Sequence, residues 1–192
     1  MDSEEFAKLL MSEDRIKWQN PREIFDQIIF LTDPTVVDMG CGPGYFVIPL
    51  LDKIGKQGKI YAVDSDPTML RRLEENLRSR SDETNVIVTE ADVTNTNLPE
   101  KCADVILFAN VLHDLEDHNA FFDEVKRILK PGGQIIDIDW QKRETDEIGP
   151  PVERRLSEND SRKILRSNGF RIVHALNAGP YHYGFACKQD NS

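Results

Sequence analysis

Short runs of apolar residues alternate along the chain with longer segments in which apolar residues recur every three or four positions. Runs of this length, rich in Val, Ile and Phe, predict β-strands. The run at residues 103–109, ADVILFA, is almost wholly apolar, as in a strand buried on both faces at the centre of a parallel sheet. The predicted strands begin with Val36 and Val37 and continue at residues 59–64, 85–89, 103–109, 134–140, 170–175 and 183–188.

The segments between these runs carry the spacing and the end signals of helices. Residues 3–32 are predicted to be helical, with Pro21 in a first turn and an Asp-Pro pair at 33–34 that ends the region. The other predicted helices follow Gly44, begin at Asp66-Pro67 and at Ser157, and include residues 121–129 with Pro131-Gly132-Gly133 as the stop. Strand and helix alternate five times before two closing strands, which predicts an α/β fold with a parallel sheet.

Three glycines, Gly40, Gly42 and Gly44, follow the first predicted strand at alternate positions, directly after Asp38. Such a loop turns tightly and lets a ligand approach the backbone without meeting a Cβ. The dinucleotide fingerprint G-x-G-x-x-G is not met, because Tyr45 stands where its last glycine is due. The pattern present is D-x-G-x-G-x-G, and a carboxylate at the strand end suits a ligand that carries an ammonium group. An ordinary strand-to-helix turn is the alternative interpretation.

Acidic residues also end the second predicted strand and follow the third. Asp64 ends the second, where a carboxylate accepts hydrogen bonds from the two vicinal hydroxyls of a ribose. Helix capping is the alternative role for Asp64, but Asp66 before Pro67 is the better cap, which leaves Asp64 for a ligand. Asp92 follows the third strand, and from this stretch alone it can be a solvated loop residue.

The carboxyl end of the fourth predicted strand carries Asn110 and, three residues further on, His113. Ligands bind at this end of the strands in parallel sheets. Three roles are open to His113: a proton acceptor, a contact to a substrate, or a histidine that binds local backbone. Trp140 and the loop after it lie at the same edge. For Trp18 a place in the core is favoured over a place in a pocket, and the aromatic turn at residues 179–183 is expected to pack as a hairpin.

Composition and charge narrow the class of protein. A length of 192 residues is most simply one unit, in which residues 1–34 form an N-terminal helical segment over the site and residues 35–192 bind the ligand. A net charge of −10 argues against a basic face for nucleic acid. Three cysteines lie far apart without C-x-x-C, so neither a metal site nor a disulfide is predicted, and Cys41 is expected to contribute its backbone N–H in the glycine loop. With no signal peptide or membrane span in the pattern, we expect a cytoplasmic monomer or homodimer.

The segment DMGCGPG at residues 38–44 resembles motif I of the class I S-adenosylmethionine (AdoMet) dependent methyltransferases. Four further segments, in the order of that family, extend the resemblance over residues 20–188: YAVDSDPTML, TEADVTNTNLP, VILFANVLHDL and RILKPGGQIIDIDW. Within the class, the chain is most similar to the branch of the ubiquinone/menaquinone biosynthesis and arsenite methyltransferases. The resemblance implies a Rossmann-like fold whose seven-stranded, mostly parallel sheet has the order 3-2-1-4-5-7-6, with strand 7 antiparallel and helices on both faces.

The resemblance also implies a site for AdoMet. Asp38 and the loop at residues 40–44 would hold the methionine end, and Asp64 the ribose. Asn110 would contribute backbone groups near the amino acid portion. The implied contacts to the adenine are Ser65, Asp66 and Met69 beside the ring, with Asp92 and Val93 on its edge.

The implied reaction is in-line transfer of the methyl group, with catalysis from alignment and desolvation. Because no large insertion forms a separate substrate domain, we expect a small-molecule acceptor or a partner protein that supplies part of the site. Trp18, His113 and Trp140 are expected to line the acceptor pocket. His113 is the candidate base when the nucleophile carries a proton of high pKa. The segment N-V-L-H at residues 110–113 differs from the N/D-P-P-Y/F of enzymes that methylate amino groups of nucleic acids and proteins. A non-catalytic module for AdoMet or S-adenosylhomocysteine and an NAD-linked oxidoreductase remain as alternatives.

Overall fold

A computed structural model of the chain describes residues 2–80, 85–144 and 148–190. Its centre is a seven-stranded sheet with the strand order β3-β2-β1-β4-β5-β7-β6. The strands pair in parallel except β7, which is antiparallel to both β5 and β6. The predicted topology is therefore confirmed. The strands are β1 Thr35–Met39, β2 Lys59–Asp64, β3 Val86–Glu90, β4 Ala103–Ala109, β5 Leu129–Trp140, β6 Phe170–Leu176 and β7 His182–Gln189.

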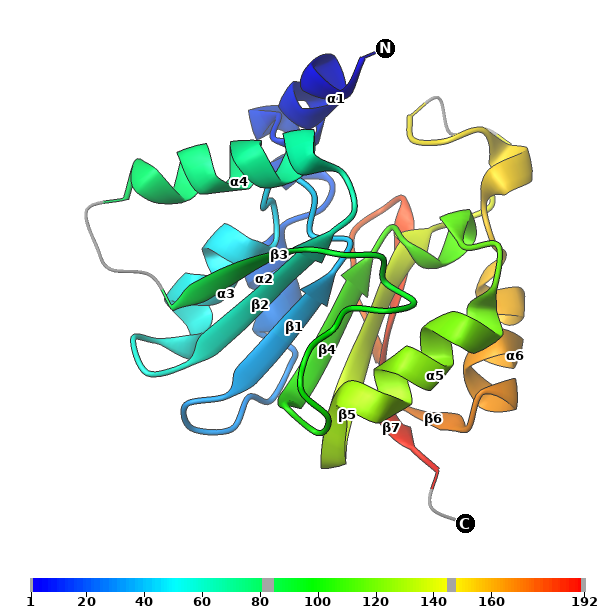
Figure 1. Cartoon of the computed structure of the whole chain (residues 1–192). Coiled ribbons are helices and arrows are strands. Elements are labelled where there is room, and N and C mark those ends of the chain that lie inside the picture. Colours follow the sequence, from blue (N-terminus) through cyan, green and yellow to red (C-terminus); the bar gives the residue numbers. More distant parts are fainter. Residues whose placement is uncertain (1, 81–84, 145–147, 191–192) are drawn as a thin grey trace.

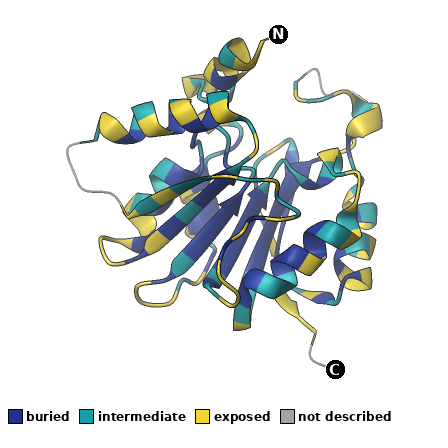
Figure 2. Ribbon diagram, viewed as in Figure 1, coloured by how far each residue is buried: buried dark blue, intermediate teal, exposed yellow. Residues whose placement is uncertain are grey.

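Helices cover both faces of this sheet (Figure 1). The α-helices are α1 Ser3–Leu10, α2 Pro21–Phe25, α3 Val47–Ile54, α4 Pro67–Arg78, α5 His118–Ile128 and α6 Glu158–Ser167, and the short 3-10 helices are η1 Glu13–Lys17, η2 Leu112–Asp114 and η3 Val152–Arg154. Alternate residues of a strand face opposite sides, so Val36 packs in a core with α2, α3 and α4 while Val37 packs in a second core with α5 and α6. The central strands are accordingly buried along most of their length (Figure 2).

Local capping signals fix where the later helices begin. The Asp66 side chain accepts from the N–H of Thr68 at 2.8 Å, with Pro67 in the first turn of α4. Ser157 caps α6 by accepting from the N–H of Asp160 at 3.1 Å. Both caps are as the sequence predicts.

Two regions differ from the prediction by more than one residue. The expected helical region at residues 3–32 is divided into α1, η1 and α2, because Ser12 and Asn20 act as caps within it and restart the chain. Helix α5 ends at Ile128, before the Pro-Gly-Gly stop, since β5 already begins at Leu129 by pairing with Ala103. A register irregularity between Ala103 and Val105 then absorbs the turn at residues 131–133.

The N-terminal segment (residues 2–34) lies against the glycine loop and α4. Helix α1 runs beside α4 (Figure 1), where Glu4 forms ion pairs with Arg71 and Arg72. At its end, the Leu10 side chain faces Gly42. The short helix η1 follows, and its Arg15 lies over the ring of Tyr45, directly after the glycine loop. No helix within the described residues is both long and apolar enough to cross a membrane.

Candidate active site

The glycine loop after β1 is held to the neighbouring strand by its own backbone. The N–H groups of Gly40 and Cys41 both donate to the carbonyl of Val63, at 2.8 and 2.9 Å. The expectation for Cys41 is therefore wrong, because its N–H is bonded within the protein and is not offered to a ligand. Its thiol is buried, and burial, with the charges of Asp38 and Asp64, raises its pKa well above the usual value.

The glycines of this loop serve different purposes. Gly40, Gly42 and Gly44 all have positive φ, at 76°, 52° and 95°, which disfavours any residue with a side chain. A Cβ at Gly44 would lie 2.5 Å from the side chain of Leu73, so that glycine permits α4 to pack closely. A Cβ at Gly42 would meet only Leu10, at 3.7 Å, so this part of the loop is open to a ligand.

Asp38 is a buried carboxylate at the end of β1 that lacks a full set of partners. Its side chain is almost completely buried, and among the described residues its Oδ2 has no hydrogen-bond partner. Burial, and secondarily the charge of Asp64, raises the pKa of Asp38 from its ordinary 3.8 to about 7. An unpartnered carboxylate in such a place is stabilised by a cation that brings its own hydrogen-bond donors.

Asp64 is half-buried at the end of β2, and backbone N–H groups already hold both of its oxygens. Oδ2 accepts from Gly42 at 2.8 Å, and Oδ1 accepts from Asp66 at 2.9 Å. The prediction that Asp66 rather than Asp64 caps α4 is confirmed, but Asp64 is not free, since it also supports the glycine loop. Each oxygen keeps a second lone pair for a hydroxyl group.

The residues expected around the adenine follow β2 and β3. Ser65 is exposed, whereas Met69 is buried on α4. Asp92 is exposed, and its Oδ1 accepts from the N–H and the hydroxyl of Thr94, which lowers the pKa of the carboxyl. Val93 is half-buried against the second core. None of these four residues is strained or has an unsatisfied buried group, and their roles around the adenine stay a prediction.

Asn110 occupies the end of β4 in a left-handed conformation with φ of 62°. Its N–H donates to the carbonyl of Ile138 at 2.7 Å, while its side-chain Oδ1 is buried without a partner among the described residues. Since β1 and β4 are adjacent, the unpartnered acceptors of Asp38 and Asn110 lie at one edge of the sheet. Two such acceptors fit the ammonium group of AdoMet, so the residues present are compatible with that cofactor.

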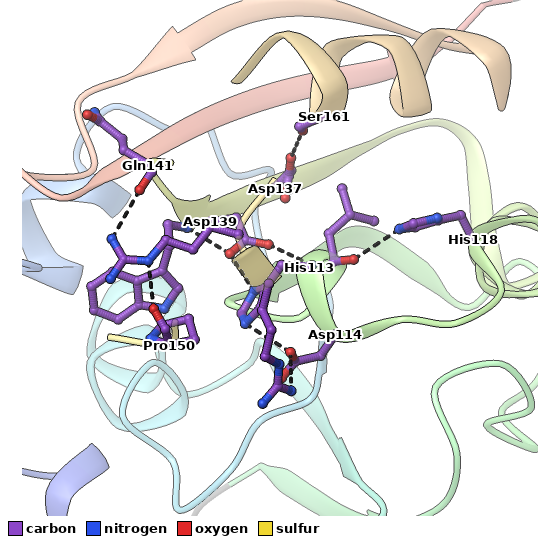
Figure 3. A network of polar contacts seen from close by, with 12 residues as sticks. His113, Asp114, His118, Asp137, Asp139, Gln141, Pro150 and Ser161 are labelled. Carbon is purple, nitrogen blue, oxygen red and sulfur yellow. Dashed lines mark hydrogen bonds and ion pairs between the residues drawn. The ribbon is translucent and has the colours of Figure 1, made fainter. Parts of the chain in front are cut away.

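His113 lies in η2, after β4, with its side chain buried between two carboxylates (Figure 3). Its Nδ1 is 2.7 Å from Oδ1 of Asp139, and its backbone N–H donates to Oδ2 of Asp139 at 3.0 Å. Its Nε2 is 3.1 Å from Oδ1 of Asp114, which is also bound by Arg154 at 2.7 Å. Burial alone lowers the pKa of His113, but the hydrogen bond and charge of Asp139, with the charge of Asp114, outweigh it, so the pKa is raised above 6.5.

A second acid stands two residues earlier on β5. Asp137 is fully buried, and the hydroxyl of Ser161 donates to its Oδ2 at 2.7 Å (Figure 3). Burial, followed by the charge of Asp139, raises the pKa of Asp137 well above its ordinary value. Asp139, and not Asp137, is the carboxylate that contacts His113. No feature of the sequence singled out Asp137 or Ser161.

An aromatic cluster (Trp18, Trp140, Tyr181 and His182) lies at the same end of the sheet. The rings of Trp140 and His182 have centroids 4.1 Å apart, and Trp18 is nearly parallel to His182, at 5.7 Å and 2°. The structure thus brings together Trp18 and Trp140, both predicted to line the acceptor pocket, with Trp18 half-buried. The turn at residues 179–183 packs as expected, and His182 is a site residue that the sequence did not single out.

His182 is unusual because it is buried with both ring nitrogens unpartnered among the described residues. Burial, and then the charges of Arg15, Arg155 and His113, lowers the pKa of His182 to about 3. The ring is therefore neutral at physiological pH, with one N–H donor and one acceptor.

Comparison with known proteins agrees with this geometry. The sequence profile of a family described as "Methyltransferase domain" matches residues 37–137, which is 101 of the 192 residues. A SAM dependent methyltransferase from Aquifex aeolicus has a similar solved structure, with a TM-score of 0.90 and 29% identity over 97% of this chain and 98% of that chain. A protein from Sulfolobus solfataricus described as a type 11 methyltransferase has a TM-score of 0.77 and 33% identity, over 91% of this chain and 95% of that chain.

A curated relative is the ubiquinone/menaquinone biosynthesis C-methyltransferase of Shewanella sediminis, 27% identical over 148 residues. The match covers 77% of this chain but 56% of the relative, so the chain spans little more than half the length of the curated relatives of this type. The family match over residues 37–137, together with the sheet order, decides between the cofactors considered above in favour of AdoMet and against NAD. The chain therefore belongs to the class I AdoMet-dependent methyltransferases.

Proposed function

We propose that this enzyme methylates a small-molecule acceptor whose nucleophilic atom loses its proton to His113. The observation that carries the proposal is the His113–Asp139 pair at the carboxyl end of β4, with 2.7 Å between Nδ1 and Oδ1. Asp139 also binds the backbone N–H of His113, so both the ring and its main chain are fixed. A base in this position is oriented before the acceptor binds, which is the condition for efficient general base catalysis.

The cofactor would lie across the ends of β1, β2 and β4. Asp38 and the carbonyl groups of the glycine loop would bind the ammonium group. Asp64 would bind the ribose hydroxyls. Asn110 would border the amino acid portion, while Ser65, Asp66, Met69, Asp92 and Val93 would border the adenine. AdoMet supplies an electrophilic methyl group on a sulfonium, so the protein has to align the nucleophile with that group and exclude water.

His113 would act through Nε2, because Nδ1 is committed to Asp139. The carboxylate of Asp139 fixes the tautomer and stabilises the imidazolium that forms when the proton is taken up. Asp114 is 3.1 Å from Nε2 and is also bound by Arg154, so this side chain must move aside or share Nε2 with the acceptor. The nucleophilic atom of the acceptor would then lie beside Nε2 of His113.

The aromatic cluster supports a planar acceptor of modest size. Trp18, which is half-buried, lies against the buried ring of Trp140 at the end of the sheet that carries His113, and an aromatic surface of this kind binds flat rings well. The N-terminal segment would form the other wall, since Trp18 belongs to it. The curated relative named above is a ubiquinone/menaquinone biosynthesis C-methyltransferase, which makes a hydroxylated ring, methylated at oxygen or at carbon, the first class of acceptor to test.

Methyl transfer from AdoMet with an isotopically labelled methyl group into a metabolite extract, followed by mass spectrometry, tests this proposal. We expect a labelled small molecule with the wild-type enzyme and about 10²- to 10⁴-fold slower labelling with His113→Asn. Glu116→Gln, an exposed change close by in the chain, is the matched control and should label as the wild type does. Labelling confined to macromolecules would contradict the small acceptor, and wild-type rates in His113→Asn would contradict the base.

A further inference from the structure

His182 is a buried polar side chain to which the free protein offers no hydrogen bond. The residue is only 2% exposed, and neither Nδ1 nor Nε2 has a partner among the described residues. Its ring is neutral, so one nitrogen donates and the other accepts. A buried polar group without a hydrogen bond costs free energy, and such groups are rare in folded proteins. An apolar ring of similar size would avoid this cost, so stability alone does not account for the imidazole.

The neighbouring strand holds His182 in place without using its nitrogens. The residue begins β7 and pairs with Trp140 at the end of β5, and its carbonyl accepts from Nε2 of Gln141 at 2.9 Å. The ring of Trp140 lies against the imidazole, with centroids 4.1 Å apart. These contacts fix the main chain and one side of the ring. A rigidly held ring that keeps a donor and an acceptor unused is preorganised for a ligand.

Trp18 covers the imidazole from the N-terminal segment. The two rings are nearly parallel, at 2°, with centroids 5.7 Å apart, which is the arrangement of two flat rings in offset stacking. The backbone of Trp18 is set by the aromatic turn, since a Cβ at Gly179 would clash with the carbonyl of Trp18. The side chain of Trp18 is half-buried, whereas Trp140 is buried. Rotation of the Trp18 side chain toward solvent would therefore open the imidazole to a flat acceptor without a change in the backbone.

His182 and His113 lie at the same end of the sheet. His113 is bound to Asp139, and Asp139 pairs across the strands with Tyr183, the residue after His182. The charge of His113 is among those that lower the pKa of His182, so the two imidazoles are within electrostatic range of each other. A small acceptor that reaches Nε2 of His113 is therefore within reach of His182 as well.

We propose that His182 is a specificity-determining residue, which hydrogen-bonds a second polar group of the methyl acceptor while His113 serves the nucleophile. This inference rests on the proposed function, in which a planar small molecule binds against the aromatic cluster. The acceptor class is then a flat ring with at least two hydrogen-bonding substituents. Because the neutral imidazole both donates and accepts, a hydroxyl or a carbonyl group fits as the second substituent. A ring without it would leave the buried nitrogens unpaired and bind less tightly.

Phenol and the three dihydroxybenzenes (catechol, resorcinol and hydroquinone) test this inference. They share one flat ring and differ only in the presence and spacing of the second hydroxyl. Trp18 and Trp140 are the two tryptophans of the sequence, so intrinsic fluorescence reports directly on the aromatic cluster. Titration of each compound into enzyme saturated with S-adenosylhomocysteine measures binding without methyl transfer.

We expect the wild-type enzyme to bind at least one dihydroxybenzene about 2- to 10-fold more tightly than phenol, the range for one neutral hydrogen bond. His182→Phe should abolish this preference by weakening the dihydroxybenzene alone. His182→Gln should keep part of it, because an amide also donates and accepts. His174→Phe is the matched control, since His174 is exposed on β6, and it should keep the full preference. In chemical denaturation without ligand, His182→Phe should be at least as stable as the wild type.

Equal wild-type affinity for phenol and all three dihydroxybenzenes, or binding of none of them, would overturn the inference. An unchanged preference in His182→Phe would also overturn it. Equal weakening of all four compounds in that variant, together with a loss of stability, would assign the imidazole a structural role and likewise contradict the proposal. Failure of the proposed base is a separate result, because it appears as wild-type labelling rates in His113→Asn and leaves the binding preference due to His182 intact.

Discussion

Asp38 makes the stability of the free protein depend on pH in an unusual direction. The pKa of a buried Asp38 is about 7 against an ordinary value of 3.8, so the folded state binds this proton more tightly than the unfolded state. The native state therefore loses stability as pH rises from about 4 to about 7. One pKa unit corresponds to about 1.36 kcal/mol, so the difference between 7 and 3.8 lowers the free energy of unfolding by about 4 kcal/mol above pH 7 relative to its value below pH 3.8.

Substitution of Asp38 by Asn removes this titration and keeps the shape. Linkage between the two pKa values gives about 2.6 kcal/mol of relative stabilisation of the variant between pH 5 and pH 8. The buried amide of Asn has a desolvation cost of its own, but this free energy does not change with pH. Chemical denaturation of both proteins at pH 5, 6, 7 and 8 therefore isolates the contribution of the carboxylate. Parallel stability curves would refute the reasoning, because they mean that Asp38 does not titrate in this range.

The same group should couple AdoMet binding to protons. Below about pH 7 the carboxyl of Asp38 is protonated in the free enzyme, and an ammonium group favours the ionised form. Binding at pH 6 should then release up to one proton, which calorimetry in buffers of different ionisation enthalpy detects. In Asp38→Asn this release should disappear, and the affinity should fall about 10- to 100-fold.

Four further substitutions test other features of the fold and the site. Gly44→Ala should destabilise by about 2 kcal/mol, and Gly42→Ala by about 1 kcal/mol, in urea denaturation, because only a Cβ at Gly44 meets a side chain at 2.5 Å while both have positive φ. Burial raises the pKa of the Glu124 carboxyl, but hydrogen bonds from Arg127 and Thr96 outweigh it, so the pKa is lowered. The ionised carboxylate therefore adds to the free energy of unfolding above its ordinary pKa of 4.5, and this contribution is lost as pH falls. Glu124→Gln should make stability depend less on pH in the acid range. Asp139→Asn should lower kcat by about 10²-fold and move the ascending limb of the kcat/KM profile to lower pH, because the pKa of His113 loses its main support.

Much of the fold follows from short-range signals. The run at residues 103–109 becomes β4 with those bounds, because a continuous apolar segment has no other stable place than the middle of the sheet. Asp66 and Ser157 start their helices as predicted, since capping involves only residues two or three positions away. Asp38 and Asp64 could also be singled out from the sequence, because each ends a predicted strand and ligands bind at the carboxyl ends of strands in a parallel sheet.

The N-terminal segment shows where such reasoning stops. Its apolar spacing suggested a helical region, but Ser12 and Asn20 cap new helices inside it, and the chain turns there. The sequence did not single out Arg15. What distinguishes this residue is its burial against Tyr45, thirty positions away, with no acidic partner among the described residues. His182 was likewise part of an expected hairpin, and only the packing of Trp18 and Trp140 against it reveals its unpartnered ring.

The structure of the complex with S-adenosylhomocysteine tests the central claim most directly. We expect the amino group of this ligand within hydrogen-bond distance of Asp38 and the ribose hydroxyls on Asp64. A nucleoside bound elsewhere, with Asp38 still unpartnered and the oxygens of Asp64 contacting only Gly42 and Asp66, would contradict it.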